Sequence, residues 1–269
     1  MAPGEPFDVS PYVQAAFEYF LRNPICQDMG RKVKIAFSAS EADSAFTYIH
    51  DFGFIPKIKK EGGREVRGFK VLIAGGLGAQ AMPAHVAYEF LEDDRIIPFM
   101  EAALRVFDRY GEREKRMKAR MKFLVQKIGL DHFMALAENE RKALKHQRYP
   151  VDSSRVQASV PPPALALPDV ALPDREKYAT WLKTNVFEQK QKGFYAVQVK
   201  VRLGNLTAAE ARSLSLLVKK FAADDIRITM NQGLLLRFVR PEALPHLFAG
   251  LDALGLGDPG FDSTADVTA

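Results

Sequence analysis

Apolar residues in the first half of the chain follow two different spacings. Apolar pairs three and four positions apart predict helices, whereas alternation of apolar and polar residues predicts strands. We expect helices over residues 10–22, 40–50, 85–92, 97–128 (interrupted near Gly111) and 131–146, and strands over residues 31–38, 52–60 and 67–74. Ser10 and Pro11 are typical of a helix start, and EGGRE between the last two strands is typical of a hairpin turn.

The second half of the chain contains a smaller pattern of the same two spacings. Residues 197–203 alternate between apolar and polar side chains and predict a half-buried strand. Thr207 and Glu210 form a capping box for a helix through about residue 222. Strands over 226–229 and 234–239 and a helix over 241–255 follow. This β-α-β-β-α order predicts a ferredoxin-like module.

Proline is concentrated between Val151 and Asp174, where five of the sixteen prolines lie. Such a segment is stiff and extended, which favours an interdomain linker. We therefore expect an α+β protein in which a mixed sheet with helices is followed by the ferredoxin-like module. The expected parts are a tail (1–9), a first module (10–150), the linker (151–174), the ferredoxin-like module (175–258) and a lead-in to a further segment (259–269).

The composition is that of a globular protein. Of 269 residues, 47% are hydrophobic and 26% are charged, and no apolar run is long enough to span a bilayer. The N-terminus has neither the basic nor the apolar region of a secretory signal. The single cysteine, Cys26, excludes an internal disulfide and an all-cysteine metal site within this chain. A cytoplasmic location without membrane contact is expected.

Positive charge is a local feature of this chain. Eight Lys and Arg residues against two Glu lie between residues 109 and 127, which leaves one net negative charge for the rest of a chain of net charge +5. Within this run Arg113, Arg116 and Arg120 recur at helical spacing, and such a row suits carboxylate or phosphate binding. A second row is apolar and predicts the buried stripe of the same helix: Met117, Met121, Leu124 and Ile128. A solvated charged helix is the alternative.

Two lysines mark the strand predicted at residues 31–38. Lys32 and Lys34 alternate with Arg31 and Val33, so both ammonium groups project from one face of the strand. Closely spaced ammonium groups repel one another, and a bound anion relieves that repulsion. The pair therefore indicates an anion site that can also donate protons. A solvated strand face is the alternative.

Two loops could contact a ligand through backbone or amide groups. The loop AGGLGAQA contains Gly76-x-Gly78-x-x-Ala81, a variant of the dinucleotide fingerprint, but Pro83 and Pro98 interrupt the expected helix and strand. Its glycines nevertheless allow close approach of a bulky anion. Asn231 and Gln232 form a hairpin turn whose amides could face a ligand. The histidines show no metal-binding spacing, and no metal ligands are expected.

The ordered set of motifs resembles the siroheme-dependent nitrite and sulfite reductases. The matching segments are GRKVKIAFS, GFKVLIAGGLG, RYGEREKRMKARMKFLVQKIG, GFYAVQVKVRLGNLT and IRITMNQGLLL, and they cover nearly all of residues 10–258. By this resemblance residues 10–150 are a first siroheme-binding half-module and residues 175–258 a second ferredoxin-like module. The family reduces nitrite to ammonia or sulfite to sulfide by six electrons, using siroheme and a [4Fe–4S] cluster.

The resemblance also implies roles for particular residues. Lys32 and Lys34 match the paired lysines that attract the substrate and help to deliver protons. Arg120 matches a position that binds the carboxylates of siroheme, assisted by Arg113 and Arg116. The remaining positions matched to cofactor binding are Arg31, Gly75, Gly76, Gly78, Asn231 and Gln232.

The resemblance further implies that other segments complete the enzyme. The chain ends at DVTA, where the family continues into its cluster-binding cysteines, so the cluster ligands are expected outside this chain. The expected partners are nitrite or sulfite, ferredoxin as electron donor and the remaining segments of the reductase, with no nucleic acid. The chain alone is expected to be inactive. The alternatives are a ferredoxin-like RNA-binding protein and a nucleotide-dependent oxidoreductase.

Overall fold

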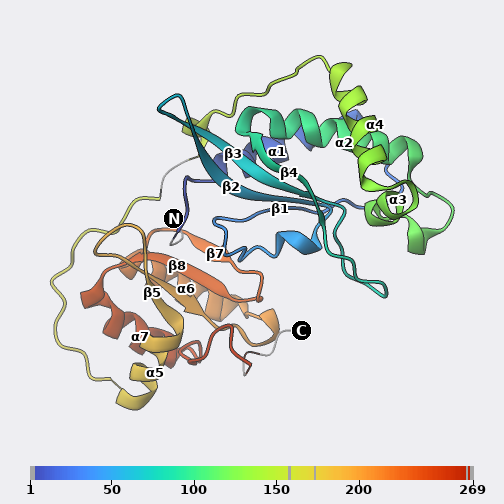
Figure 1. The fold of residues 1–269 in the computed structure, drawn as a ribbon. Coiled ribbons are helices and arrows are strands. Elements are labelled where there is room, and N and C mark those ends of the chain that lie inside the picture. Colours follow the sequence, from blue (N-terminus) through green and yellow to red (C-terminus); the bar gives the residue numbers. More distant parts are fainter. Residues whose placement is uncertain (1–3, 157–158, 173, 265, 267–269) are drawn as a thin grey trace. The chain divides into compact units, whose positions relative to one another are not determined.

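The computed structural model describes residues 4–156, 159–172, 174–264 and 266. The chain divides into two compact units, an N-terminal unit of residues 2–157 and a C-terminal unit of residues 158–269. Figure 1 shows that each unit has its own sheet with its own helices. Each unit therefore has an independent core, and each is described by itself.

The N-terminal unit is a mixed sheet with helices. Its strands lie in the order β1-β2-β3-β4, with β1 parallel to β2 and the other neighbours antiparallel. The elements are α1 (Ser10–Phe20), β1 (Ile35–Phe37), β2 (Phe52–Glu61), β3 (Arg64–Ile73), β4 (His85–Glu92), α2 (Ile96–Tyr110), α3 (Met121–Ile128) and α4 (Leu130–Lys142). Short 3-10 turns cover Pro24–Cys26, Thr47–Ile49, Asp93–Arg95, Arg116–Lys118 and Ser153–Arg155.

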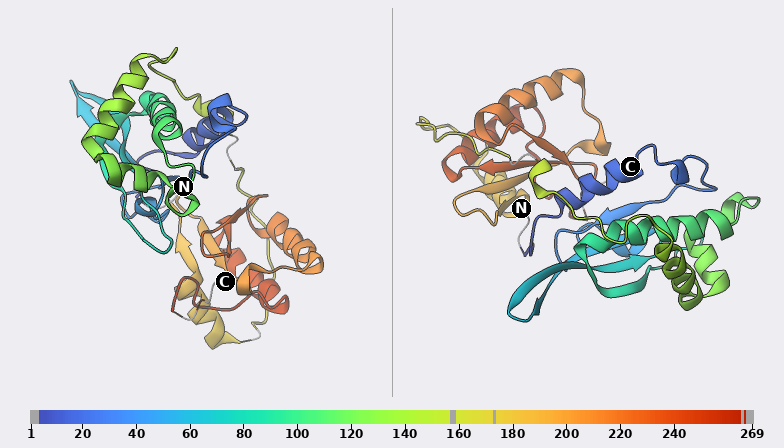
Figure 2. Two further views of the ribbon diagram at one scale, coloured as in Figure 1. Left: turned by 90° about the vertical axis from the view of Figure 1, so that its right-hand side faces the viewer. Right: turned by 90° about the horizontal axis from the view of Figure 1, so that it is seen from above.

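Alternation along the strands separates the two faces of this sheet. One face carries aromatic and branched side chains that pack against the helices in the main core: Phe52, Phe54, Phe69, Val71 and Ile73. Helices α2 and α4 lie side by side within this layer (Figures 1 and 2). The opposite face carries a small cluster of Ile55, Leu72 and Ala84. Phe7 and Val9, from the segment expected to be a tail, are buried in the main core.

Several predicted elements of this unit are confirmed. The predicted hairpin is present as β2 and β3, whose register runs from Phe52 opposite Ile73 to Glu61 opposite Arg64. The helices predicted at 10–22 and 131–146 are present as α1 and α4. The helix begins at Ser10 as expected, but Val9 is its N-cap, and the Ser10 backbone N–H donates to the Asp8 carboxylate.

Residues 85–92 form β4, so the helix predicted there is wrong. Antiparallel pairing with β3 places Tyr88 opposite Val71 and Leu91 opposite Phe69. The edge of β3 offers backbone donors and acceptors that must be paired, and this long-range pairing outweighs the local apolar spacing.

The helix predicted at 40–50 is also wrong. Asp43 and Phe46 adopt left-handed backbone angles, with φ of 49° and 51°. The carboxylate of Asp43 accepts hydrogen bonds from the backbone N–H and the hydroxyl of Thr47. Such side-chain bonds to the local backbone compete with helical hydrogen bonds. The segment is therefore a series of turns that ends in the 3-10 turn before β2.

The long basic helix is interrupted more widely than the sequence predicted. Helix α2 ends at Tyr110 and α3 begins at Met121, so the residues between them do not form an α-helix. The carboxylate of Glu112 accepts the backbone N–H groups of Glu114 and Lys115, which fixes a turn instead. Met117 is 77% exposed and does not belong to a buried stripe. The predicted helical row of guanidinium groups is therefore wrong.

The C-terminal unit is an antiparallel sheet with helices. Its strand order is β5-β6-β8-β7. The elements are α5 (Arg175–Asn185), β5 (Val186–Glu188), β6 (Tyr195–Val199), α6 (Ala208–Phe221), β7 (Ile226–Ile228), β8 (Leu234–Val239) and α7 (Leu244–Ala253), with 3-10 turns at Arg202–Gly204 and Pro241–Ala243. The predicted β-α-β-β-α order corresponds to β6 through α7, preceded by α5 and β5.

The capping box predicted at the start of α6 is confirmed. The Thr207 hydroxyl accepts the Glu210 backbone N–H at 3.2 Å, and the Glu210 carboxylate accepts the Thr207 backbone N–H at 2.7 Å. The core beneath the helices contains Trp181, Leu236 and Phe248, all fully buried. This unit therefore combines a locally determined helix start with a sheet-and-helix core.

The proline-rich segment packs against the C-terminal unit over its described residues. The Arg237 guanidinium, which is 7% exposed, donates to the Ser159 hydroxyl and to the Asp225 carboxylate. Arg240 donates to the carbonyl of Pro162 at 3.2 Å. Described residues of this segment are therefore held by side-chain hydrogen bonds.

Candidate functional site

Four segments that are distant in sequence meet at one edge of the N-terminal sheet, where β1 and β2 begin and β3 ends. They are the basic segment before β1, Asp51 before β2, the glycine loop (residues 74–83) after β3, and the residues that begin α3. We refer to Lys32, Lys34, Asp51, Arg120, Lys122 and the glycine loop as the cationic site. Most of its members came from separate motifs in the sequence.

Asp51 connects three of these segments. Its carboxylate accepts the backbone N–H of Lys34 at 2.8 Å, and it accepts Nε and Nη2 of Arg120 at 3.1 and 2.8 Å. The Asp51 side chain is 1% exposed and that of Arg120 is 13% exposed. Burial raises the pKa of Asp51, whereas the Lys34 N–H and the charge of Arg120 act in the opposite direction. The pair is a buried ion pair that joins α3 to the sheet.

Lys32 and Lys34 lie before β1 and not within it, because the strand is shorter than the sequence predicted. The Lys34 carbonyl accepts the backbone N–H of Phe52 at 3.1 Å, whereas its N–H is bound by the Asp51 side chain. A side chain thus replaces the ladder partner that a strand would need. Both lysine side chains are exposed.

The glycine loop is shaped by close contacts within the protein. A Cβ on Gly75 would lie 2.4 Å from the carbonyl oxygen of Tyr48, and one on Gly76 would lie 3.0 Å from Nη2 of Arg120. Gly76 also pairs with Met82 in an isolated antiparallel bridge. Gly78 has φ of 114°, a region that favours glycine. Internal packing therefore already requires glycine at Gly75, where the close atom is a backbone oxygen, whereas at Gly76 the contact is with a side-chain end.

Lys122 holds this loop from the side of α3. Its ammonium group donates to the carbonyl oxygens of Gly76, Leu77 and Gln80 at 3.2, 3.1 and 2.5 Å, and the residue is 3% exposed. Burial, together with the nearby charge of Arg120, lowers the pKa of Lys122. Three carbonyls match the three donors of an ammonium group, so the side chain acts as a clamp on the loop.

The remaining predicted arginines occupy different surroundings. Nε of Arg31 is buried and has no hydrogen-bond partner among the described residues. Arg113 donates to the carbonyl of Asp28 at 3.0 Å and to the Asp108 carboxylate. Arg116 is exposed in the turn between α2 and α3. Arg113 is therefore engaged in local structure, whereas Arg31 retains an unsatisfied donor.

Asn231 and Gln232 belong to the C-terminal unit, in the turn between β7 and β8. The turn is closed by the Thr229 N–H donating to the Gly233 carbonyl at 2.9 Å, and Gln232 has φ of 61°. A Cβ on Gly233 would lie 2.5 Å from the Phe261 ring, which explains glycine at that position. The predicted ligand contact of these two residues stays a prediction.

Sequence reasoning missed Asp51 and Lys122. Asp51 is a single acidic residue between turns and a strand, and nothing in its local pattern indicates burial. Lys122 lies in the basic run and was counted only as one of its charges. The one available signal is that Lys122 lies between Met121 and Leu124, which are both buried. In a short helix, a residue between two buried positions lies at the border of the buried face.

Among the described residues there is no group of three or more His, Cys, Asp or Glu side chains that could hold a metal ion. No helix in the described part of the chain is both long and apolar enough to cross a membrane.

Comparison with known proteins assigns the family. Residues 1–145, more than half of the chain, match the family described as the nitrite and sulphite reductase 4Fe-4S domain. The chain belongs to the nitrite and sulphite reductase family. Residues 187–254 match the nitrite/sulfite reductase ferredoxin-like half domain.

Individual members of the family match across nearly the whole chain. The chloroplastic ferredoxin–nitrite reductase of Zea mays is 26% identical over 92% of this chain, and sulfite reductase [ferredoxin] 1 of Mycolicibacterium paratuberculosis is 28% identical over 94%. The solved structure of the Mycobacterium tuberculosis NirA protein matches 95% of this chain with a TM-score of 0.72 and 27% identity. The chain spans 40% of the length of these two reductases and 42% of the NirA chain.

Family membership and the fold also decide against the two alternatives. The ferredoxin-like unit that suggested an RNA-binding module contains residues 187–254, which match the reductase half domain. The dinucleotide fingerprint fails because the glycine loop leads into β4, whereas that motif requires the N-terminus of a helix to hold the phosphates. The predicted α+β class, with a mixed sheet followed by a ferredoxin-like unit, is confirmed.

Proposed function

We propose that this chain forms part of a siroheme-dependent reductase that converts nitrite to ammonia or sulfite to sulfide. The observation that carries the proposal is the convergence of the basic segment, the glycine loop and the start of α3 around Asp51. Relatives named as ferredoxin-dependent nitrite and sulfite reductases support ferredoxin as the electron donor. A reductase of this kind needs a cationic surface for two anions, the macrocycle and the substrate.

Siroheme supplies the iron that would bind the substrate and pass electrons to it. The residues of this chain fit such a group because Arg31 keeps a buried Nε without a hydrogen-bond partner within the described part of the chain. A guanidinium of this kind pairs well with a carboxylate of the macrocycle. Arg120 uses Nε and Nη2 for Asp51, which leaves its third nitrogen to pair with a carboxylate of the cofactor.

Lys32 and Lys34 would act on the substrate. Both lysine side chains are exposed, and the backbone of Lys34 is hydrogen-bonded to Asp51 of the Asp51–Arg120 pair. Fixed positive charge attracts nitrite or sulfite and stabilises the negative charge that develops as an oxygen departs. Each oxygen that leaves as water takes up two protons, and an ammonium group can donate one of them.

The [4Fe–4S] cluster does not fit within this chain. Such clusters are held by four cysteine thiolates, whereas this chain has Cys26 alone. Burial also raises the pKa of the Cys26 thiol, with nearby Glu101 and Asp108 acting in the same direction, which disfavours the thiolate. The cluster ligands, and with them electron entry, would come from other segments of the reductase.

Siroheme titration of the purified chain tests this proposal. We expect weak binding that is reduced about tenfold by Arg31→Gln, because one charge-assisted hydrogen bond is lost. The double variant Lys32→Gln/Lys34→Gln should keep siroheme binding but lose the change in absorption spectrum on adding nitrite or sulfite. Lys59→Gln/Lys60→Gln, on the β2–β3 hairpin, is the matched control.

An activity assay of the chain alone can contradict the proposal. With a chemical reductant and siroheme, we expect no formation of ammonia or sulfide, because the cluster and the rest of the cofactor site are needed. Turnover by the chain alone, or equal siroheme affinity of the Arg31 variant and the wild type, would contradict the proposal.

A further inference from the structure

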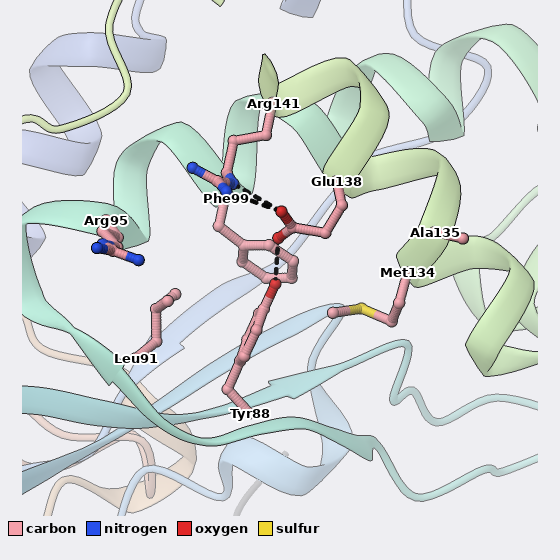
Figure 3. A pocket seen from close by; sticks show the side chains of 8 residues that line it. All are labelled: Tyr88, Leu91, Arg95, Phe99, Met134, Ala135, Glu138 and Arg141. Carbon is pink, nitrogen blue, oxygen red and sulfur yellow. Dashed lines mark hydrogen bonds and ion pairs between the residues drawn. The ribbon is translucent and has the colours of Figure 1, made fainter.

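The N-terminal unit contains a cavity that lies away from the cationic site. It has a volume of about 460 Å³ and opens between the end of β4 and the helices α2 and α4. Its wall includes Tyr88, Arg95, Phe99, Met134, Glu138 and Arg141 (Figure 3). The cationic site lies at the end of the β3–β4 pair where Ile73 is opposite His85, whereas this cavity reaches Leu91, opposite Phe69 near the other end. A ligand of one site would therefore not occupy the other.

Polar groups in one part of the cavity wall satisfy one another. The Tyr88 hydroxyl donates to Glu138 at 2.6 Å, and Arg141 donates to the other oxygen of Glu138 through Nε and Nη2 at 2.9 and 2.8 Å. Arg141 also donates to the side chain of Gln147 at 3.1 Å. Burial opposes the ionisation of Glu138, but the hydrogen bonds from Arg141 and Tyr88 prevail and lower its pKa. The charges of Glu138 and Arg141 are thus matched.

Arg95 differs from Arg141 in its hydrogen bonding. Its Nε forms a long ion pair with the Glu92 carboxylate at 3.6 Å, and among the described residues its guanidinium makes no hydrogen bond. Glu92 is instead approached more closely by Arg148, at 2.6 Å. Arg95 therefore keeps donors available at the cavity wall.

Apolar surface lies across the cavity from these cations. Figure 3 shows the guanidinium groups of Arg95 and Arg141 on one side of the Phe99 ring and the thioether of Met134 on the other. Phe99 and Tyr88 pack edge to face with their ring centroids 5.2 Å apart. The cavity thus combines cationic and apolar groups, and its volume falls in the range typical of small-molecule sites.

We propose that this cavity binds a small amphipathic carboxylate, with the carboxylate on Arg95 and the apolar part against Phe99 and Met134. The lining carries two arginines and one glutamate, and Arg95 has only a long ion pair, at 3.6 Å, with Glu92 outside the lining, so a carboxylate can compete for its guanidinium. A dianion would be repelled by Glu138 and by the nearby Glu92. An arginine fork also matches the planar geometry of a carboxylate. This site is independent of the function proposed above.

Binding of benzoate to the full chain, with benzamide as its uncharged isostere, tests the proposal. We expect benzoate to shift the methyl NMR signal of Met134 saturably, because its ring would lie against that side chain. The affinity should fall at least tenfold with Arg95→Gln, whereas Arg64→Gln, which removes the same charge at the β2–β3 hairpin, should leave it unchanged. Ala135→Trp, at an exposed position of the cavity lining, should block binding without altering the core.

Three results would each overturn the proposal. They are the absence of a saturable shift with benzoate, equal affinities for benzoate and benzamide, and equal loss of affinity in the Arg95 and Arg64 variants. The circular dichroism spectrum of each variant shows whether the fold is retained. Arg95 is part of the surface turn before α2, so Arg95→Gln is expected to fold normally.

Discussion

The backbone N–H of Lys34 donates a 2.8 Å hydrogen bond to the buried carboxylate of Asp51. This contact replaces a strand-to-strand hydrogen bond by one to a charged side chain. The same carboxylate binds the Arg120 guanidinium, so the position of the lysine pair depends on the start of α3. The arrangement explains how motifs 86 residues apart, at Lys34 and Arg120, reach one edge of the sheet.

The first prediction concerns this carboxylate. Asp51→Asn should lower the free energy of unfolding by about 3 kcal/mol, because it leaves the largely buried Arg120 without its counter-charge. Urea unfolding at neutral pH measures the effect. Asp108→Asn breaks the exposed ion pair with Arg113 and should cost only about 0.5 kcal/mol. Equal losses of unfolding free energy in the two variants would show that the buried Asp51–Arg120 pair stabilises the fold no more than the exposed pair does.

The second prediction concerns the clamp on the glycine loop. Lys122→Met should speed hydrogen exchange at the amides of Gly76 and Met82 by about tenfold, because three carbonyl contacts are lost and the bridge between these residues opens more often. Hydrogen-exchange NMR on both proteins measures it. Unchanged protection of both amides would mean that the bridge holds the loop without the ammonium group.

Lys122 also predicts a dependence of stability on pH. Its folded pKa is lowered, so the unfolded chain binds the proton more readily. Its contribution to stability should therefore increase as pH rises through the lowered pKa toward the ordinary value of about 10.4. The wild type should gain stability relative to Lys122→Met over the alkaline range in which pH rises toward about 10.4. A difference in unfolding free energy that stays constant across this range would refute the assignment.

The third prediction concerns Glu138 in the cavity wall. Its pKa is lowered in the folded protein, so its contribution to stability is present above its ordinary pKa and is lost as pH falls through the lowered value. Glu138→Gln should cost about 0.5 to 1 kcal/mol at neutral pH, allowing for its partial exposure, and nothing at pH of about 2. Urea titrations at both pH values measure this. A cost that does not decrease in acid would exclude the ionised hydrogen-bond network.

The fourth prediction concerns the start of α6 in the C-terminal unit. Thr207→Ala removes the hydroxyl that accepts the Glu210 backbone N–H and should lower the unfolding free energy of this unit by about 1 kcal/mol. The fluorescence of Trp181, which lies in the core of the same unit, reports its unfolding in urea. Ser213→Ala, inside the same helix, is the control and should have little effect. A similar loss in both variants would rule out a specific contribution of the cap.

Local sequence patterns anticipated the elements whose stability is local. The hairpin of β2 and β3 follows from alternation around two glycines, and the start of α6 follows from Thr207 and Glu210, because turn geometry and capping act over a few residues. The ordered motifs also indicated the reductase family and the fold class. The same motifs also indicate Lys32, Lys34, Arg120 and the glycine loop as candidate site residues.

Only the tertiary structure decided which of these residues meet and which become buried. Residues 85–92 form a strand because β3 offers an edge to pair with, and residues 112–120 leave the helix because Glu112 caps a turn. Asp51 and Lys122 are buried because their charges find partners from distant segments. Long-range hydrogen bonding and desolvation cannot be inferred from the local spacing of residues. The sequence therefore indicated which functional groups are present, whereas the tertiary structure determined where they lie and which of them contact one another.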